Sequence, residues 1–433
     1  MGSLLRAGKL KLENVTDNIY ELKNFDYPVV SILLPVYREE ISLPYLLKSI
    51  SELHYPKDKL DIHLLMEPDD DPTIKSVKSI PYNNIRNGKI EFANNMPIKL
   101  HVWDNTVIKI NYIYLDPVNS RSKPKSLNIG LPSTTGRYLI VYDAEDRPQP
   151  DQLLRMVLYM ERNSEVDCLQ AKLGFYNTGQ SLLTKLFALE YLNHFTILLP
   201  LIYHNGLVVL LGGTSNFFRT IALKKLDGWD QKNVTEDADL GVRLARTKLI
   251  TLPFNTTTWE EAPPKLYPWL RQRIRWNKGF MYTAKIHFRE PLSLIKEIGL
   301  GRAIFLFYQL TGPIINMVSL LGWIIFSIVL ANFLGIPLYP ITDWISEAYN
   351  FNPFLFYSAI FTFVIGITFV EIVTALSLKR NNYAKRKYLL LPLMPLYNIL
   401  LSVAGLVAII EFIFKPQVWH KTYHGFSMEN NNL

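Results

Sequence analysis

The chain has 433 residues, a formal net charge of +8 and a hydrophobic fraction of 49%. Its single cysteine, Cys168, excludes an intramolecular disulfide, so the protein need not see an oxidising compartment. Much of the positive excess lies beside long apolar runs near the C-terminus. This placement favours a membrane surface and a phosphate-bearing ligand over nucleic acid as partners. Residues 1–27 read as a polar N-terminal arm without a signal peptide.

Short apolar runs alternate with helical patterns over the next part of the chain. Residues 29–35 predict a buried strand, and Leu43, Leu46, Leu47 and Ile50 then repeat at helical spacing. Further strands are predicted at 60–66, 100–103 and 138–142. This alternation predicts an α/β domain with a mostly parallel, Rossmann-like sheet and helices on both faces.

Acidic residues follow two of these strands. Glu67 and residues 69–71 come after the second strand, where a solvated loop and a ligand site remain equally good interpretations. Asp143 and Glu145 come directly after the strand at 138–142, and both can reach one Mg²⁺ or Mn²⁺. Such an ion would stabilise a diphosphate leaving group. The intervening loop 121–128 carries two lysines, which could meet phosphate or lie on the surface.

A basic segment near the end of the domain reads as a helix. There Gln272, Arg275, Trp276 and Gly279 fall at i, i+3, i+4 and i+7, so they share one face. Arginine pairs phosphate bidentately, and an indole can stack on a sugar ring. Asp237 could serve as the base for a hydroxyl nucleophile, or could only favour the start of a helix. Together these features predict sugar transfer from a nucleotide donor.

Four motifs in order carry a family resemblance: Pro35-Val36-Tyr37, Asp143-x-Glu145, Thr235-Glu236-Asp237 and Gln272-x-x-Arg275-Trp276. They resemble the membrane-embedded, cellulose-synthase-like branch of the family 2 glycosyltransferases. These are GT-A fold enzymes related to the processive synthases of cellulose, hyaluronan and chitin. The resemblance covers roughly residues 28–288. It implies an inverting hexosyltransferase that moves a sugar from a UDP- or GDP-sugar to a growing β-glycan with Mg²⁺ or Mn²⁺.

The resemblance also implies residue roles. It assigns the donor to Pro35, Tyr37, Glu39, Glu67, Asp69, Lys125, Asp143, Gln272 and Arg275. It assigns the metal to Asp143 and Glu145, catalysis to the general base Asp237 with Glu236 beside it, and the acceptor to Thr214, Ser215 and Trp276. The second metal-binding acid is usually aspartate in this family. The longer arm of Glu145 could shift the ion or change the metal preference.

The C-terminal part predicts an integral membrane protein. No charged residue occurs from 303 to 342, and about 20 apolar residues span a bilayer. The expected organisation is a cytoplasmic GT-A domain over 28–300, a transmembrane region over 301–414 and a tail over 415–433. Spans are expected at 305–333, 354–376 and 388–414, with 181–204 and 265–300 as interfacial helices. Five basic residues over 379–387 place that connection, and the catalytic domain, in the cytoplasm.

Several alternatives stay open. The membrane region could cross three or four times, and several chains could share one channel as a homo-oligomer. The acceptor could be a glycan or a lipid-linked molecule, so a single transfer onto a polyprenyl phosphate is an alternative to elongation. A membrane scaffold with an inactive domain is a second alternative, but the intact acids Asp143, Glu145 and Asp237 argue against it. A transporter is disfavoured because its spans would carry charged residues. The sugar, the nucleotide and the linkage are not readable.

Overall fold

The computed structural model describes residues 25–67, 69–79, 98–101, 107–114, 122–312, 314–315, 322–327, 334, 353–381 and 385–414. The expected arm lies almost wholly outside these residues, and the expected tail entirely so. The strands are β1 (Val30–Val36), β2 (Leu60–Met66), β3 (Ile98–His101), β4 (Val107–Tyr114), β5 (Tyr138–Val141), β6 (Arg147–Pro148), β7 (Val166–Phe175), β8 (Asn216–Arg219) and β9 (Ile250–Glu260).

The described helices fall into two groups by position in the chain. Those of the α/β part are α2 (Leu43–Ser51), η2 (Lys57–Lys59), α3 (Asp71–Ser79), α4 (Lys123–Gly130), η3 (Leu131–Ser133), α5 (Gln152–Arg162), α8 (Thr220–Lys225) and α9 (Glu236–Arg246). The others are α6 (Leu182–Asn193), η4 (His194–Leu198), α7 (Leu199–His204), α10 (Leu266–His287), α11 (Pro291–Ile298), α12 (Leu300–Leu310), α15 (Pro353–Arg380), η5 (Lys385–Leu393) and α16 (Met394–Phe414).

The described strands form one sheet in the order β3-β4-β2-β1-β5-β8-β7-β9-β6. The α/β class is as predicted, but the sheet is mixed rather than mostly parallel. Strands β4, β2, β1 and β5 run parallel, whereas β8 is antiparallel to both β5 and β7. The reason lies in the preceding loop: Ser215 N–H donates to Val141 O at the carboxyl end of β5, at 2.9 Å. From there β8 can only run back along β5.

Alternating side chains of the strands divide the core between two faces. On one face Ile32 and Leu34 of β1 pack with residues of α2 and α5. On the other face Leu33 packs with residues of α4, α8 and α9. This period of two buries both faces of the sheet. The carboxyl ends of the parallel strands β1, β2 and β5 therefore meet at one edge, where ligands bind in such sheets.

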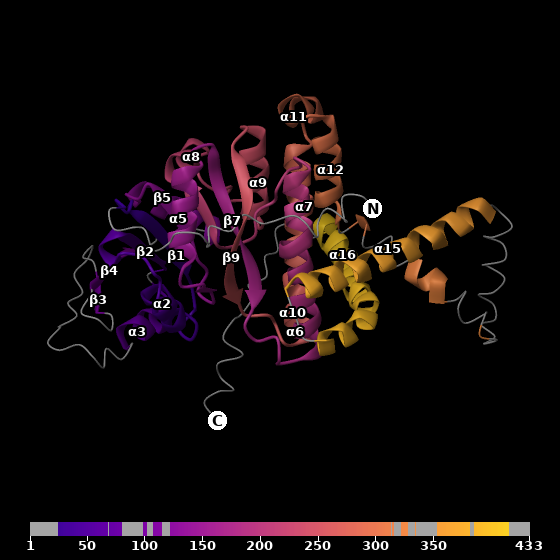
Figure 1. Ribbon diagram of the computed structural model, residues 1–433, viewed down its shortest axis with the longest axis horizontal. Helices are drawn as coiled ribbons and strands as arrows, with labels where there is room; N and C mark the ends of the chain where they lie inside the picture. The colour runs from indigo at the N-terminus through magenta and orange to yellow at the C-terminus, as the bar shows by residue number, and fades with distance from the viewer. Residues whose placement is uncertain are drawn as a thin grey trace.

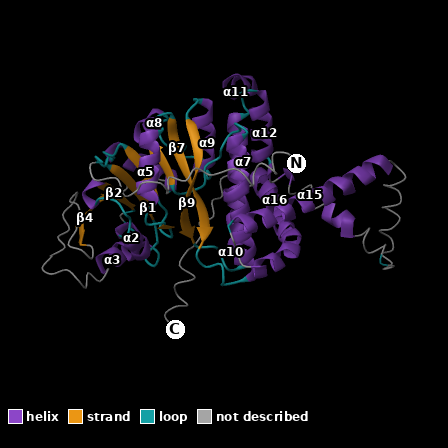
Figure 2. Cartoon of the chain, viewed as in Figure 1, coloured by secondary structure: helices purple, strands orange, loops and turns teal. Residues whose placement is uncertain are grey.

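The remaining helices stand beside the sheet, where α10 packs against both α12 and α16 (Figure 1; Figure 2). Segments α6, η4 and α7 follow one another without a break. The expected span 354–376 lies within the 28-residue helix α15. The expected span 388–414 corresponds to η5 and α16. The expected span 305–333 begins inside α12, and much of it lies outside the described residues.

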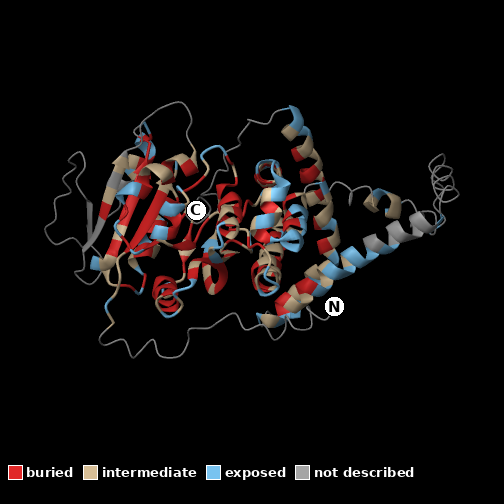
Figure 3. Ribbon diagram, turned by 90° about the horizontal axis from the view of Figure 1, so that it is seen from above, coloured by how far each residue is buried: buried red, intermediate tan, exposed pale blue. Residues whose placement is uncertain are grey.

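Two helical segments of the described chain are long and apolar enough to cross a membrane, by length and composition alone. They are 182–204 and 385–414. The first is 56% buried over its apolar window, as the core helix of a soluble protein could also be. Exposed residues follow α15 where it leaves the body of the protein (Figure 3). They include the large apolar side chains Phe361, Ile365 and Phe369, which lie on one side of the helix.

Candidate active site

A cavity of about 790 Å³ opens at the carboxyl edge of the sheet, between the strand ends and helices α6, α10 and α16. Most of the residues expected to form a site line it. They are Pro35, Tyr37, Glu39, Glu67, Asp143, Glu145, Glu236, Asp237, Gln272, Arg275 and Trp276. Residues that are more than 200 positions apart in the sequence thus share one wall. Helix α16 closes the side away from the sheet with Tyr397 and Asn398.

The turn after β5 is held by Asp146, which is fully buried. Its Oδ2 accepts the Asp143 N–H at 2.7 Å and also accepts the Thr214 hydroxyl. Lys123 reaches the same turn from the first residue of α4. Its ammonium lies 2.5 Å from Asp143 Oδ1 and donates to the Gly213 carbonyl at 2.6 Å. Asp143 is therefore fixed by a cation and by a backbone turn.

The lysine at the cavity is Lys123 and not the expected Lys125. Helix α4 begins at Lys123, and Ser126, Leu127 and Gly130 continue its buried face at i+3, i+4 and i+7. Lys125 lies two positions further along, about 200° around the helix. It is absent from the residues that line the cavity. The sequence does not show the helical phase that selects between the two lysines.

Carboxylates crowd this site. Burial, and then the neighbouring Asp143, raise the pKa of Glu145 to about 8. Burial and then the nearby acids raise the pKa of Asp146 and of Glu260 well above the usual range. Burial alone would lower the pKa of Lys123, but Asp143 and the acids of α9 outweigh it and raise that pKa. The site thus holds more acid than its cations neutralise.

These residues fit a divalent cation that is shared with a ligand. Asp146 Oδ1 is a buried carboxylate oxygen for which the described residues supply no hydrogen-bond donor. Asp143 and Glu145 raise the charge density beside it. Within the described ranges no three His, Cys, Asp or Glu residues are arranged to hold a metal by themselves. Two carboxylates with oxygens from a bound phosphate are the kind of ligand set that Mg²⁺ takes.

Helix α9 begins at Glu236, so Asp237 lies in its first turn. Asn233 supports this turn: its Oδ1 accepts the Thr235 N–H at 3.0 Å, and its amide donates to Thr283 of α10 at 2.8 Å. Burial, followed by Asp237, raises the pKa of Glu236 to about 7. Burial also raises the pKa of Asp237. Both carboxyls in this wall of the cavity therefore have raised pKa values, mainly because they are buried.

Helix α10 approaches this turn closely because residue 279 is glycine. A Cβ at Gly279 would lie 2.3 Å from Thr235 Cγ2 and 2.5 Å from its Oγ1. The same helix presents Gln272, Arg275 and Trp276 to the cavity. Burial lowers the pKa of Arg275, while the nearby acids oppose that shift. The close contact at Gly279 brings the guanidinium of Arg275 near the carboxylates of α9, so that their charges interact.

Sequence reasoning missed the ion pair that anchors α10. Arg273 Nη1 donates to Glu190 Oε1 of α6 at 2.8 Å, and Tyr397 of α16 donates to Glu190 Oε2 at 2.6 Å. The Arg273 guanidinium also lies 4.9 Å from the Trp276 ring centroid. These contacts orient the indole from behind. An arginine adjacent to the recognised motif was the only sequence signal for this role.

Besides Lys125, three more of the expected ligand residues do not line the cavity. Asp69 is exposed, and its neighbour Asp70 is buried instead, where Oδ2 accepts the Arg38 N–H at 2.5 Å. This bond supports Arg38 at a φ of 56°. Thr214 and Ser215, expected at the acceptor, are buried behind the wall.

The hydroxyls of Thr214 and Ser215 bond inside the protein. Thr214 donates to Asp146 Oδ2 and also lies 3.2 Å from Val141 O, and Ser215 donates to Thr258 at 2.6 Å. Ser215 has a φ of 57°, which turns its side chain inward. Gly212 and Gly213 line the cavity in their place. A glycine-rich motif in sequence does not reveal which of its members faces the ligand.

Residues 138–370 match the sequence profile described as "Glycosyl transferase family group 2". The chain is 27% identical to "Probable glycosyltransferase YdaM" of Bacillus subtilis over 265 residues, which are 60% of this chain and 56% of that protein. It is 24% identical to "Glucomannan 4-beta-mannosyltransferase 9" of Arabidopsis thaliana over 326 residues, which are 70% of this chain and 57% of that protein. The chain thus spans about half the length of these curated relatives.

Among solved structures, the chain is similar to "Mannosyltransferase PcManGT from Pyrobaculum calidifontis in complex with GDP-Man and Mn2+". The two share 15% sequence identity with a TM-score of 0.49. The match covers 87% of this chain and 94% of the other.

Proposed function

Because the chain belongs to glycosyl transferase family group 2, we propose that it is a membrane-bound, inverting hexosyltransferase. It transfers a sugar from a nucleotide-sugar donor to the hydroxyl of a growing β-glycan. The observation that carries this proposal is the single cavity lined by Asp143, Asp237 and the Gln272, Arg275 and Trp276 face of α10. Diphosphate ligands, a base and an aromatic platform are the groups that this reaction requires.

The donor diphosphate is held from two sides. Arg275 and Gln272 reach it from α10, and Lys123 reaches it from α4. Guanidinium groups bind phosphate bidentately, and an ammonium adds a point charge. Tyr37, Glu39 and Glu67 line the part of the cavity that would receive the nucleoside. The buried cations stabilise the leaving nucleoside diphosphate because charge accumulates there as the bond breaks.

Asp237 acts as the general base. Its carboxylate takes the proton of the acceptor hydroxyl, and the acceptor oxygen forms the new bond to the anomeric carbon. The bond from that carbon to the diphosphate oxygen breaks, and the electron pair leaves with the nucleoside diphosphate. Displacement from the opposite face inverts the anomeric centre. The raised pKa of Asp237 suits this role because a carboxylate with a higher pKa is a stronger base towards the acceptor hydroxyl.

Asp143 and Glu145 would hold a divalent cation against the donor diphosphate. When bound, Mg²⁺ or Mn²⁺ supplies charge neutralisation at the leaving group. Asp146 positions the turn through its bond to the Asp143 N–H. Glu236 lies beside the base. Its raised pKa lets it remain protonated near neutrality, and this relieves repulsion between the adjacent acids.

Trp276 provides the platform for the acceptor sugar. Its ring lines the cavity and is backed by Arg273, so its orientation is fixed before the acceptor arrives. Helices 182–204 and 385–414 would lie in or at the bilayer, with the α/β part in the cytoplasm where nucleotide sugars are made. The exposed apolar side chains of α15 support that placement, because such a face requires cover.

The test is a donor panel with the full chain in detergent. GDP-mannose comes first, because relatives of the chain are named glucomannan 4-β-mannosyltransferases. UDP-glucose, UDP-galactose and UDP-N-acetylglucosamine follow, each with Mg²⁺ or Mn²⁺, and products are sized. A ladder of products from one donor is the expected result. One lipid-soluble product would replace glycan elongation by the loading of a lipid carrier, and turnover of no donor would overturn the proposal.

A further inference from the structure

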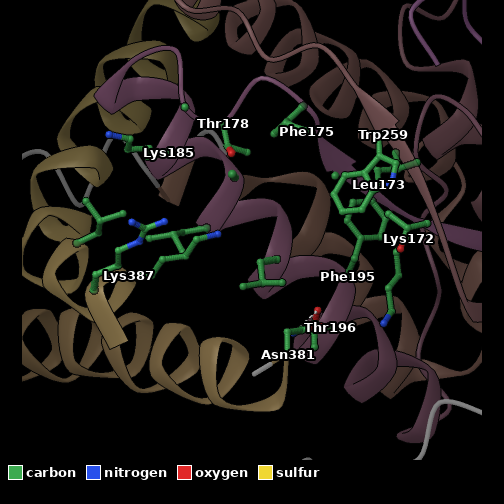
Figure 4. A pocket seen from close by; sticks show the side chains of 18 residues that line it. Lys172, Leu173, Phe175, Thr178, Lys185, Phe195, Thr196, Trp259, Asn381 and Lys387 are labelled. Atoms are coloured by element: carbon green, nitrogen blue, oxygen red, sulfur yellow. Dashed lines mark hydrogen bonds between the residues drawn. The ribbon is translucent and has the colours of Figure 1, made fainter. Parts of the chain in front are cut away.

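A second cavity of about 710 Å³ lies beside the active site. Leu173 and Phe195 line both cavities and form the wall between them. The second cavity is bounded by β7 and β9 of the sheet, by α6 and η4, and by η5. Figure 4 shows Lys185 and Lys387 on one side of it, and Lys172 with Trp259 on the other. The proposed transfer reaction uses none of its polar residues.

The charge of this cavity has one sign. Lys172, Lys185, Arg386 and Lys387 line it, and no Asp or Glu occurs among its described lining residues. Burial, and then the nearby guanidinium groups of Arg380 and Arg155, lower the pKa of Lys172 to about 8. A cation in that position is costly unless an anion accompanies it. The cavity therefore has the electrostatics of an anion site.

The same cavity has long apolar walls. Leu189 and Leu192 come from α6, Leu390 comes from η5, and the Trp259 ring is 41% exposed. An inorganic anion would leave these surfaces wet, whereas an amphiphile would cover them. The occupant that complements the whole cavity is therefore anionic at one end and apolar at the other.

The position in the fold points to the bilayer as the source of this amphiphile. The segments 182–204 and 385–414 are the described helices that are able to cross a membrane, and both line the cavity. Lys185 lies in the first turn of one segment, and Arg386 and Lys387 lie in the first turn of the other. Basic residues at the ends of membrane helices meet lipid phosphates, each with about 1 kcal/mol of attraction at an anionic surface.

We propose that this cavity binds an anionic phospholipid of the membrane, with its headgroup lying between Lys185, Arg386 and Lys387 on one side and Lys172 on the other, and with its acyl chains against Leu189, Leu192 and Leu390. The lipid ties the sheet to the two helical segments, because its cationic contacts come from β7, α6 and η5. Its binding does not depend on the proposed transfer reaction, so each can fail without the other.

The test measures lipid binding by the full chain in detergent. Short-chain phosphatidylglycerol, phosphatidylcholine and inorganic phosphate are titrated, and lipid adducts are followed by native mass spectrometry. Phosphatidylglycerol should bind tightest. The double variant Lys185→Glu/Arg386→Glu changes two exposed residues, so it should fold, and it should weaken phosphatidylglycerol binding by at least about tenfold. Lys48→Glu/Lys225→Glu makes the same charge change on exposed residues of α2 and α8.

The control variant should retain wild-type binding within about twofold, since distant exposed charges are screened. Lys172→Gln removes a positive charge and leaves a polar side chain of roughly similar size inside the cavity. It should also weaken phosphatidylglycerol binding, which makes it a second test. Equal affinity for phosphatidylglycerol and phosphatidylcholine would overturn the proposal. Equal weakening in the control variant would overturn it too. Complete competition by inorganic phosphate at millimolar concentration would replace the lipid by a simple phosphate.

Location is tested with phosphatidylglycerol that carries bromine on its acyl chains, which quenches nearby tryptophan. Trp259 lines the cavity, so quenching should occur in the wild type and should fall in Trp259→Phe. Quenching that is unchanged in this variant would place the lipid elsewhere on the protein.

Discussion

Two neighbouring cavities of similar size differ in the sign of their charge. The first, of about 790 Å³, is surrounded by carboxylates that include Asp143, Glu145 and Asp237. The second, of about 710 Å³, is lined by basic residues and no described acid. Among the described lining residues, only Leu173 and Phe195 are common to both walls. Size therefore does not distinguish the two cavities, whereas the sign of their charge does. The acidic cavity favours a cation together with a diphosphate, whereas the basic cavity favours an anionic ligand without a cation.

The largest expected effect concerns Asp237, the proposed general base in the acidic cavity. Asp237→Asn keeps the size of the side chain but cannot accept the acceptor proton. Transfer should fall by about 10³-fold, within the usual contribution of a general base. Donor affinity should stay within about threefold, as measured by nucleotide titration of the same protein. Transfer at the wild-type rate would remove Asp237 from the mechanism.

The second largest effect is expected when a cation is removed from the acidic cavity. Lys123→Met should lower transfer by about 10–100-fold, because a buried charge-assisted hydrogen bond is worth about 1.5–3 kcal/mol. Lys125→Met is the matched control, since Lys125 lies outside the cavity lining, and its rate should remain within about twofold. The measurement is the transfer rate of each variant at a saturating donor concentration. The reverse order would restore Lys125 as the donor ligand.

A third effect tests the close approach of α10. Gly279→Ala places a Cβ against Thr235, and overpacking of this kind costs about 1–3 kcal/mol. The free energy of unfolding should fall by that amount, and transfer should fall with it because Asp237 follows Thr235. Gly301→Ala in α12 is the control, as a Cβ there meets nothing within 4 Å. Thr235→Ser with Gly279→Ala should recover part of the loss, and no recovery would place the strain elsewhere.

The last prediction concerns pH. Glu145 and Glu236 have pKa values near 8 and 7 in the fold, above their usual value of 4.5, so the folded protein holds protons that the unfolded chain releases. Stability of the metal-free protein should therefore be highest below about pH 4.5 for these two groups and fall as pH rises to about 8. Melting curves should show this fall, and Mn²⁺ should raise the melting temperature more at pH 8 than at pH 5. An equal rise at both values would separate the metal from Glu145.

The sequence predicts an element well where a residue pattern extends over several positions. It predicts a site residue poorly where the orientation of a single side chain decides whether that residue faces the cavity. Strand β1 was predicted from a continuous apolar run, and the shared face of α10 from helical spacing; neither prediction needs knowledge of the neighbouring elements. Lys123 against Lys125, and Asp70 against Asp69, differ by one or two positions, and only the phase of a turn selects between them. Strand β9 was not predicted, because its run contains Pro253 and several threonines without clear alternation.

The second cavity could not be predicted from the sequence, for a different reason. Lys172 and Lys185 lie far from Arg386 in the chain, and no motif joins the three residues. They meet because 182–204 and 385–414 pack together beside the sheet. Long-range packing of this kind leaves no local pattern in a single sequence.

Helix α10 also decides how this protein can be handled. Its residues Ile274 and Met281 pack against Ala404 and Ala408 of α16, while Arg273 bonds to Glu190 and to Tyr397. A chain cut near residue 300 to obtain a water-soluble enzyme would lose α16. It would leave Ile274 and Met281 facing water and would free the helix that carries Trp276. We therefore expect the α/β part to keep the orientation of α10 only when α16 is present.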